Sequence, residues 1–409
     1  MDGPFVIVGA GQAGLQVAES LRQEGFQGRV LLYGEESHQP YNRPPLSKKW
    51  LQERPDLASL AIRGPEFLQR KQIELRTQAR VAAIDRAARE VLLADGNRIA
   101  WQGLALCTGA RLRALPLPGA GLRNVFGLKT IDDALSIATA LDECAAQGAP
   151  LVVIGGGFIG LEVAATARKR GITVTVLEGL SRLMSRVVAP IVSEAAARVH
   201  ATHGVQLHFD VRIVELAGRD GRVAAVRLAD GRAFPAGCVV VGVGVEQNDQ
   251  LARDAGLACE RGIVVDACSR SSDPAIVAAG DCTARRLADG TLLRLESVQN
   301  AVEQGKSAAA ALLGKDRPFV ASPWFWSDQY DMKMQMVGLS MGYDQVVTRG
   351  DLAKPAFSAY YFRGSKLIAV DSLSRPGDHM QARKLLDRGI SPTPQQVSDE
   401  QFNLTGLLA

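Results

Sequence analysis

The sequence predicts an α/β protein with two Rossmann-like βαβ units, and two stretches carry that prediction. Residues 5–14 read FVIVGAGQAG and residues 151–162 read LVVIGGGFIGLE, so each places a short apolar run directly before closely spaced glycines. In each case a helix-like segment and a second apolar run follow. A strand, a tight turn, a helix and a second strand in this order build one half of a doubly wound parallel sheet. Because 409 residues exceed one compact core, we expect two or three domains.

The first glycine loop has the spacing of a nucleotide-binding turn, with glycines at 9, 11 and 14. Gly9 permits a sharp turn, Gly11 lets backbone N–H groups approach a pyrophosphate, and Gly14 lets helix and strand pack closely. The strand-like VLLY then leads to Glu35 and Glu36, and an acid at this distance can accept hydrogen bonds from ribose hydroxyls. One such loop is weak evidence, because glycine turns also serve packing alone.

The second loop repeats the whole arrangement. Glycines 155, 157 and 160 follow LVVI and open the helix-like LEVAATARKRG, and the strand-like TVTVLE ends at Glu178. Glu178 would accept a free ribose 2′-hydroxyl and repel a 2′-phosphate, which favours NAD over NADP. Arg182 and Arg186 follow closely and leave three alternatives: they pair with NAD phosphates, they tolerate NADP, or they lie in solvent.

Charge, apolar runs and cysteine spacing argue against several other classes of protein. The formal charge of +4 argues against a strongly cationic nucleic-acid binder. Glycine or charge interrupts every apolar run well before about 20 residues, so we expect no membrane span. Met1 is followed almost at once by the strand-like FVIVG, so we expect no signal peptide. The six cysteines include no C-x-x-C pair, which predicts reduced thiols in the cytoplasm and no metal site.

Three further stretches carry a family resemblance: LALCTGAR (104–111), VVVGVGVEQND (239–249) and IVAAGDCT (276–283). With the two loops, they resemble the two-dinucleotide-fold flavoprotein reductases, which have a glutathione-reductase-like fold. The resemblance implies that the N-terminal loop holds FAD and that an inserted domain holds NAD(P)H. It also implies that Asp281, in the Gly280-Asp281 step, accepts hydrogen bonds from the flavin ribityl chain.

The segment PYNRPPLSK (40–48) separates the branches of that superfamily. Its disulfide reductases place redox cysteines beside the flavin, whereas this segment has prolines and no cysteine, which excludes a thiol relay. R-P-P-L-S-K and WFWSDQ (324–329) resemble the ferredoxin reductases of bacterial oxygenase systems. The resemblance implies transfer of electrons from NADH through FAD to a small [2Fe–2S] ferredoxin that feeds a Rieske-type oxygenase or a cytochrome P450. The alternatives are an NADH oxidase-like flavoprotein and one like apoptosis-inducing factor.

The resemblance also assigns residues. It places Lys48 near flavin N5 and pairs it with Glu162, as the two catalytic residues; the alternative is two unrelated surface charges. Trp326 is placed near the flavin or nicotinamide, with core packing as the competing interpretation. Some relatives have tryptophan where this chain has Val298, so stacking by that ring is absent here. Relatives usually have arginine where this chain has Lys129, which is a departure at the expected adenine-side contact. The residues predicted to bind FAD are Gly9, Gly11, Gly14, Glu35, Arg43, Lys48, Ala79, Thr108, Gly109, Lys129, Gly280, Asp281, Val298 and Trp326. Those predicted to bind NAD are Gly155, Gly157, Ile159, Gly160, Glu162, Glu178, Arg182, Arg186, Gly242 and Gly244.

The expected domain order is an FAD-binding domain formed by residues 1–112 and 245–320, an NAD-binding domain at 113–244 and a C-terminal α+β domain at 321–409. In that last domain, MKMQMVG reads as a strand with Lys333 and Gln335 on one face and the methionines and Val337 on the other. Because small ferredoxins are commonly acidic, we expect a basic docking surface. The candidates are Arg63, in a locally basic stretch at 63–89, and Lys333.

Overall fold

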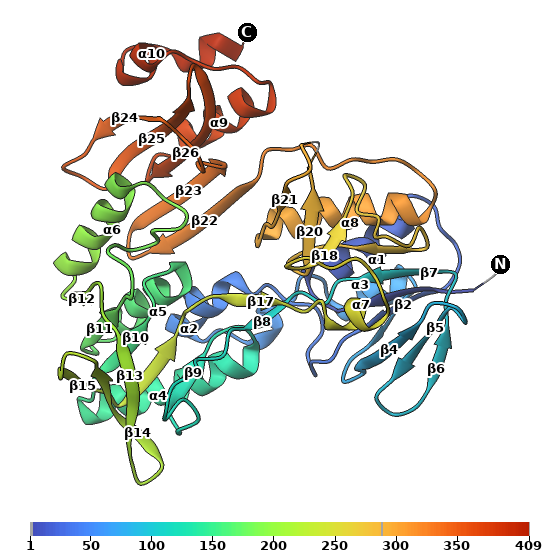
Figure 1. Cartoon of the computed structure of the whole chain (residues 1–409), viewed down its shortest axis with the longest axis horizontal. Helices are drawn as coiled ribbons and strands as arrows, with labels where there is room; N and C mark the ends of the chain where they lie inside the picture. The colour runs from blue at the N-terminus through green and yellow to red at the C-terminus, as the bar shows by residue number, and fades with distance from the viewer. Residues whose placement is uncertain (1–2, 288, 409) are drawn as a thin grey trace. The chain divides into compact units, whose positions relative to one another are not determined.

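The computed structural model describes residues 3–287 and 289–408, and the chain divides into two compact units (Figure 1). The first unit holds the residues up to 42 with 56–111 and 245–321, and the second holds 43–55, 112–244 and the residues from 322 onward. Three of the breaks fall within one residue of the expected domain limits. The segment 43–55, which carries Lys48, belongs to the second unit. The four-part division into FAD, NAD and C-terminal domains stays a prediction.

The first unit is built on a five-stranded parallel sheet with the order β3-β2-β1-β7-β19. Both faces of this sheet are covered. Ile7 faces a core formed with helices α1 and α8, whereas the neighbouring Val6 faces a core formed with β4, β5 and β18. A parallel sheet buried on both faces explains why its strands are continuously apolar. The unit also contains two three-stranded sheets, β4-β5-β6 and β18-β20-β21, and the two-stranded sheet β17-β8.

The elements of the first unit, with β8 ending one residue beyond it, are β1 (Phe5–Val8), α1 (Gln12–Gln23), β2 (Val30–Tyr33), η2 (Leu57–Leu60), α3 (Pro65–Arg70), β3 (Ile73–Arg76), β4 (Val81–Asp85), β5 (Glu90–Leu93), β6 (Arg98–Ala100), β7 (Gly103–Leu106), β8 (Ala110–Leu112), β17 (Val245–Gln247), α7 (Gln250–Asp254), β18 (Ile263–Val265), β19 (Ile276–Ala278), β20 (Thr283–Arg286), β21 (Leu292–Leu293) and α8 (Val298–Leu312).

The second unit contains another five-stranded parallel sheet, in the order β12-β11-β10-β16-β9. The antiparallel sheet β13-β14-β15 packs against one face of it through residues such as Val226 and Val152. Helix α5 follows β10 directly, so the second glycine loop is the strand-to-helix turn that the sequence predicts.

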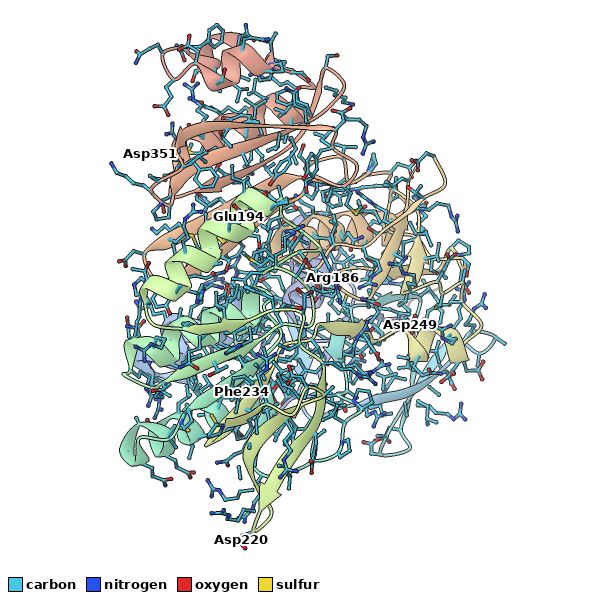
Figure 2. All side chains as sticks on the ribbon, turned by 60° about the vertical axis from the view of Figure 1, so that its left-hand side comes forward. Arg186, Glu194, Asp220, Phe234, Asp249 and Asp351 are labelled. Atoms are coloured by element: carbon cyan, nitrogen blue, oxygen red, sulfur yellow. The ribbon has the colours of Figure 1, made fainter. Side chains whose placement is uncertain are left out.

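A third sheet closes the second unit, with the antiparallel order β22-β23-β26-β25-β24. Helix α6 packs on one face of this sheet and α9 on the other, and Figure 2 shows Glu194 on α6 beside the sheet. The methionines of β23 share one face, as expected, and that face packs on α6. The prediction that Val337 joins them is wrong, because Val337 packs on the α9 face. Odd-numbered residues of this strand point away from the even-numbered methionines.

The elements of the second unit are η1 (Pro44–Ser47), α2 (Lys49–Glu53), β9 (Val125–Gly127), α4 (Ile131–Gln147), β10 (Leu151–Ile154), α5 (Phe158–Lys169), β11 (Val174–Leu177), α6 (Pro190–Thr202), β12 (Gln206–His208), β13 (Ile213–Arg219), β14 (Arg222–Leu228), β15 (Ala233–Pro235), β16 (Cys238–Val241), β22 (Trp324–Gln329), β23 (Met332–Gly338), β24 (Gln345–Asp351), β25 (Ala356–Arg363), β26 (Lys366–Leu373), α9 (Pro376–Asp387), α10 (Pro394–Ser398) and η3 (Leu404–Leu408).

Among the residues described, no helix has the length and apolar character needed to cross a membrane.

Candidate functional site

The first glycine loop has one glycine for each of three physical demands. A Cβ on Gly9 would lie 2.1 Å from the carbonyl oxygen of Cys107, and one on Gly14 would lie 1.9 Å from that of Gly9. These two glycines allow the turn and the close packing of helix on strand. A Cβ on Gly11 would meet no described atom within 4 Å. Gly11 is the N-cap of α1 and has no side chain to cap it, so the first N–H groups of the helix are available to a phosphate.

Two predicted segments lie against this loop in the first unit. Thr108 follows Cys107, and its hydroxyl donates to the Asn248 carbonyl at 2.6 Å, while the Gly109 carbonyl accepts the Asn248 N–H at 3.0 Å. Gly280 has a φ of +87°, and a Cβ there would lie 3.0 Å from the Ala13 side chain. The Gly280 turn therefore meets the start of α1, and Thr108 lies beside Gly9, where an added Cβ would be 3.1 Å from the Thr108 nitrogen.

The turn at Gly280 is held by a residue that sequence reasoning missed. Gln304, on α8, is buried, and its side-chain oxygen accepts from Gly280 N at 2.8 Å and from Thr283 Oγ1 at 3.0 Å. The sequence shows only a glutamine within the alanine-rich segment 298–312. The structure shows that it is buried, where its amide needs partners. Helix α8 begins at Val298, which is half-buried, with Ser297 as its N-cap.

The predicted ribose-binding acid of the first unit is open to solvent. The Glu35 side chain is 73% exposed, and its nearest cationic partner is Arg80, at 3.8 Å. Glu36 instead accepts a hydrogen bond from the Tyr41 hydroxyl at 2.5 Å. Ala79 donates its N–H to the Gly34 carbonyl at 2.8 Å, which places it beside the end of β2, directly before these acids.

The second glycine loop repeats the first. A Cβ on Gly155 would lie 2.6 Å from the Gly242 carbonyl oxygen, and one on Gly160 would lie 2.5 Å from the Gly155 carbonyl oxygen. Gly157 is the N-cap of α5, and its nearest neighbour for a Cβ is 3.9 Å away. The loop that holds Gly242 and Gly244 thus packs on the second glycine turn, at the carboxyl ends of β10 and β16.

Glu178 directly follows β11, and two backbone groups orient its carboxylate. Oε2 accepts the Gly156 N–H at 2.6 Å, and Oε1 accepts the Leu180 N–H at 2.8 Å. A carboxylate has about four lone-pair sites, so both oxygens can still accept ribose hydroxyls. Two backbone donors therefore fix the orientation of the carboxylate beside the second glycine loop.

The remaining predicted residues near this loop differ in whether their side chains already bond to other groups of the protein. Arg182 donates to the carbonyls of Val188 at 2.7 Å and Ser185 at 2.8 Å, so its guanidinium braces the 185–188 turn. Arg186 is exposed in that turn, where Figure 2 marks it. Ile159, in the first turn of α5, is 42% exposed although apolar. Of the two arginines, only Arg186 has a side chain that solvent surrounds.

Lys48 and Glu162 form an ion pair within the second unit. Lys48 Nζ lies 2.9 Å from Glu162 Oε1, with side-chain exposures of 16% and 3%. Two hydroxyls complete the carboxylate: Ser47 Oγ donates to Oε2 and Ser327 Oγ donates to Oε1, both at 2.5 Å. Burial raises the pKa of Glu162, while the Lys48 ammonium and the two hydroxyls oppose that rise. A buried, fully hydrogen-bonded carboxylate therefore holds a lysine near the surface.

Three other predicted residues, Arg43, Lys129 and Trp326, also belong to the second unit. Arg43 donates to the Lys129 carbonyl at 2.7 Å, which fixes the turn before α4. Trp326 is half-buried on β22, with its ring centroid 5.5 Å from that of Trp324 and 6.4 Å from that of Phe325. Trp326 thus combines an aromatic cluster with a partly exposed face.

The two candidate docking residues differ. Arg63 Nε lies 2.8 Å from the Glu19 carboxylate, which is 5% exposed, so the charge of Arg63 is compensated by a buried acid. Lys333 is exposed on β23 and stands opposite Asp328 in the strand register. A reversal at Arg63 would place two carboxylates together and would test stability as much as docking.

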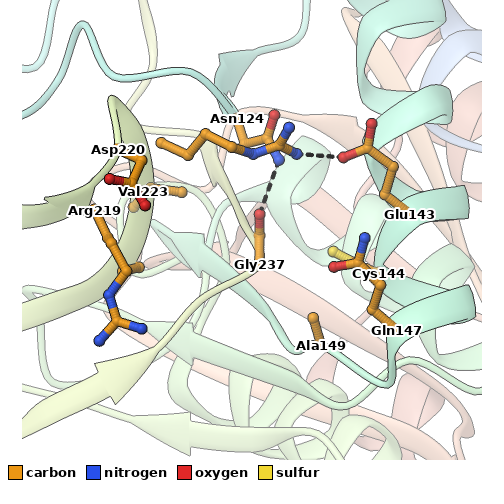
Figure 3. Close-up of a pocket in the computed structure, with 11 residues that line it drawn as sticks. Asn124, Glu143, Cys144, Gln147, Ala149, Arg219, Asp220, Val223 and Gly237 are labelled. Carbon is orange, nitrogen blue, oxygen red and sulfur yellow. Dashed lines mark hydrogen bonds and ion pairs between the residues drawn. The ribbon is translucent and has the colours of Figure 1, made fainter.

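A cavity of about 420 Å³ lies elsewhere in the second unit (Figure 3). Its wall includes Asn124, Glu143, Cys144, Arg222 and Gly237, and Arg222 forms an ion pair with Glu143. Gly237 comes directly before β16, so the cavity lies at the amino end of that strand. Dinucleotides bind at the carboxyl ends of such strands, so this cavity is separate from the second glycine loop.

The whole chain is similar to known reductases. The family described as "Pyridine nucleotide-disulphide oxidoreductase" matches residues 3–305, and the one described as "Reductase C-terminal" matches residues 324–408. The chain belongs to the pyridine nucleotide-disulphide oxidoreductase family.

Particular relatives cover nearly its full length. Rhodocoxin reductase of Rhodococcus erythropolis is 44% identical over 98% of this chain and 93% of its own. Putidaredoxin reductase CamA of Pseudomonas putida is 39% identical over 99% and 96%. Among solved structures, the ferredoxin reductase for the CYP199A2 system from Rhodopseudomonas palustris superposes with a TM-score of 0.96, at 44% identity over 100% of both chains. These similarities extend to the C-terminal sheet, which supplies Ser327.

Proposed function

We propose that this protein is an NADH-dependent flavoprotein reductase. It passes electrons from NADH through FAD to a small [2Fe–2S] ferredoxin, which feeds a Rieske-type oxygenase or a cytochrome P450. The observation that carries the proposal is the full-length similarity to rhodocoxin and putidaredoxin reductases, C-terminal domain included. A solved structure described as a covalent complex of putidaredoxin reductase with putidaredoxin, 38% identical over 100% of this chain with a TM-score of 0.95, supports a ferredoxin partner.

The residues of both glycine loops fit the two cofactors. Gly11 and Gly157 leave helix N-termini without a side chain in front of them, which suits the pyrophosphates of FAD and of NADH respectively. Gly280 and Asp281 would hold the flavin ribityl chain, and Glu178 would hold the nicotinamide-nucleotide ribose. When bound, a flavin takes a hydride from reduced nicotinamide and releases electrons one at a time, which suits an iron–sulfur acceptor.

The chain's own contribution is positional and electrostatic. Lys48 carries a positive charge whose direction Glu162 fixes, and such a preorganised charge stabilises negative charge that develops as hydride arrives. The partial positive charge at the start of α8 would act in the same sense on an anionic reduced ring. The segment 40–48 contains no cysteine, so no thiol of that segment takes part. We also place the enzyme in the cytoplasm, a proposal that its six free cysteines support.

Two measurements test the proposal together. Purified protein should be yellow and release one FAD per chain on heating, because only the first glycine loop is assigned to the flavin. NADH turnover in air should then rise sharply when a [2Fe–2S] ferredoxin is added. A colourless folded protein would refute the flavin assignment, and turnover indifferent to ferredoxin would instead favour an NADH oxidase.

A further inference from the structure

A buried chain of hydrogen bonds leads from His200 to the Glu162 carboxylate. His200 Nε2 lies 3.0 Å from Gln329 Oε1, Gln329 Nε2 lies 3.2 Å from Ser327 Oγ, and Ser327 Oγ lies 2.5 Å from Glu162 Oε1. The three residues before the carboxylate are fully buried. The chain links α6, β22 and α5, all within the second unit.

The chemistry of these groups gives the chain a direction. An amide oxygen only accepts, so His200 must carry its hydrogen on Nε2 to bond with Gln329. The Gln329 amide group donates to Ser327, whose own hydrogen is then directed at Glu162. Each N–H or O–H thus points toward the carboxylate, which is the arrangement that stabilises its ionised form.

The far end of the chain is a neutral imidazole. Burial lowers the pKa of His200 to about 4, and in the described part of the chain its Nδ1 atom is buried without a hydrogen-bond partner. Neutral imidazole carries one hydrogen, and the bond to Gln329 assigns that hydrogen to Nε2. The structure therefore specifies one tautomer, which can be measured.

We propose that Ser327, Gln329 and His200 are positioning residues for hydride transfer, acting through Glu162 on Lys48. Glu162 Oε1 accepts from both Lys48 and Ser327, so the serine hydroxyl restricts the carboxylate to the orientation in which it meets the ammonium. The inference rests on the proposed function and adds that a strand of the C-terminal sheet takes part in the electron-accepting half of the reaction.

The main test compares two buried serines of the same sheet in the FAD-loaded protein. Ser327→Ala should lower the rate of flavin reduction by NADH about tenfold while leaving the dissociation constant for NADH unchanged. Ser372→Ala is the matched control, because Ser372 is 1% exposed on β26 and bonds with Ser358 instead. Its rate should stay at the wild-type value, and both variants should show similar Tm.

A second variant gives a readout that does not depend on the cofactor. Gln329→Met has similar volume and removes both hydrogen bonds. In nitrogen-15 histidine spectra, the wild type should show His200 as the Nε2–H tautomer, and Gln329→Met should shift or mix it. A Ser327→Ala rate equal to wild type, with Lys48→Ala slowed, would overturn the inference and leave the proposed function standing. His200 as the Nδ1–H tautomer in the wild type would also overturn it. A wild type that NADH does not reduce would refute the proposed function itself.

Discussion

The role of the Lys48–Glu162 ion pair can be tested with the adjacent Lys49 as a control. Lys48→Ala and Glu162→Gln should each slow flavin reduction by NADH about tenfold or more and retain FAD. The first removes the positive charge near the proposed hydride path, and the second removes the carboxylate that orients it. The adjacent Lys49 is exposed and 3.8 Å from Glu53, so Lys49→Ala should have no effect on the rate. Stopped-flow bleaching of the flavin band measures the step. If all three variants reduced the flavin at the wild-type rate, the Lys48–Glu162 ion pair would have a structural role only.

Glu178 should determine the choice between NADH and NADPH. We expect at least about a tenfold preference for NADH in kcat/KM, equivalent to about 1.4 kcal/mol, because the carboxylate would repel a 2′-phosphate. Glu178→Ala should lower that ratio, chiefly by raising kcat/KM for NADPH.

The Glu178 carboxylate also accepts two backbone N–H groups, at Gly156 and Leu180, so Ala changes the loop as well as the charge. Glu178→Gln keeps the volume and removes the charge, and it should move the ratio in the same direction. A wild type with equal kcat/KM for both nucleotides would contradict the assignment.

The glycines and Glu178 could be predicted from sequence because their demands are local: each belongs to a single strand–turn–helix segment. Ser47, Ser327 and His200 could not, since their importance comes from partners far away in the chain. A partial signal exists in WFWSDQ, where Ser327 and Gln329 alternate along one face of an otherwise aromatic strand. The pattern indicates a buried polar face on this strand, but only the tertiary structure shows which groups Ser327 and Gln329 bond with.

Strands β25 and β26 contain a buried carboxyl that should make stability depend on pH. Burial raises the pKa of Asp371 to about 7, although the Tyr361 hydroxyl donates to it at 2.5 Å and opposes the rise. The folded chain then binds more protons than the unfolded chain between the ordinary carboxyl pKa, about 4, and pH 7. The stabilisation from protonated Asp371 is thus fully present below about pH 4 and is lost as pH rises through 7.

Asp371→Asn should remove this dependence. Relative to wild type, the variant should gain on the order of 2 kcal/mol between pH 5.5 and pH 8, seen as a Tm difference moving in its favour by about 3 °C. Asp351→Asn, an exposed carboxyl at the end of β24 marked in Figure 2, is the control and should show a constant difference. A Tm difference for Asp371→Asn that is flat across this range would show that Asp371 titrates as an ordinary carboxyl.

The alternating pattern of MKMQMVG predicted strand β23, and the structure places Val337 on the face opposite the methionines, as expected for odd-numbered and even-numbered residues of one strand. The sequence says less about which segments of the chain pack into the same compact unit. Arg43–Pro55 precedes the rest of the second unit by more than fifty residues, yet it joins that unit through bonds such as Ser47–Glu162 and Arg54–Asp142. No periodic pattern encodes such long-range pairing, which explains why the sequence placed this segment with its neighbours in the chain.

Charge compensation across the whole molecule changes the expected ferredoxin-docking surface. In the basic stretch at 63–89, four arginines form ion pairs, three of them with acids outside the stretch: Arg63 with Glu19, Arg76 with Glu74, Arg80 with Glu35 and Arg86 with Asp273. The local excess seen in the sequence is therefore largely neutralised in the fold. Arg70, on α3, keeps its guanidinium 5.6 Å from the Phe67 ring and tests the same surface without exposing Glu19 to a second carboxylate.

Lys333 is the sharper probe of docking. If an acidic ferredoxin approaches β23, Lys333→Glu should raise KM for ferredoxin several-fold at low ionic strength, because it converts an attraction into a repulsion beside Asp328. The effect should fade as salt is raised toward about 0.5 M, where the Debye length drops to a few ångströms.

Lys366→Glu is the control for Lys333→Glu. It makes the same change of net charge at the start of β26, so it separates a local contact from long-range steering. Flavin reduction by NADH should stay at the wild-type rate in both variants, since neither residue belongs to the Lys48–Glu162 pair. A ferredoxin KM that responds to neither Lys333→Glu nor salt would mean that recognition is apolar, and Arg70→Glu would then be expected to have no effect either.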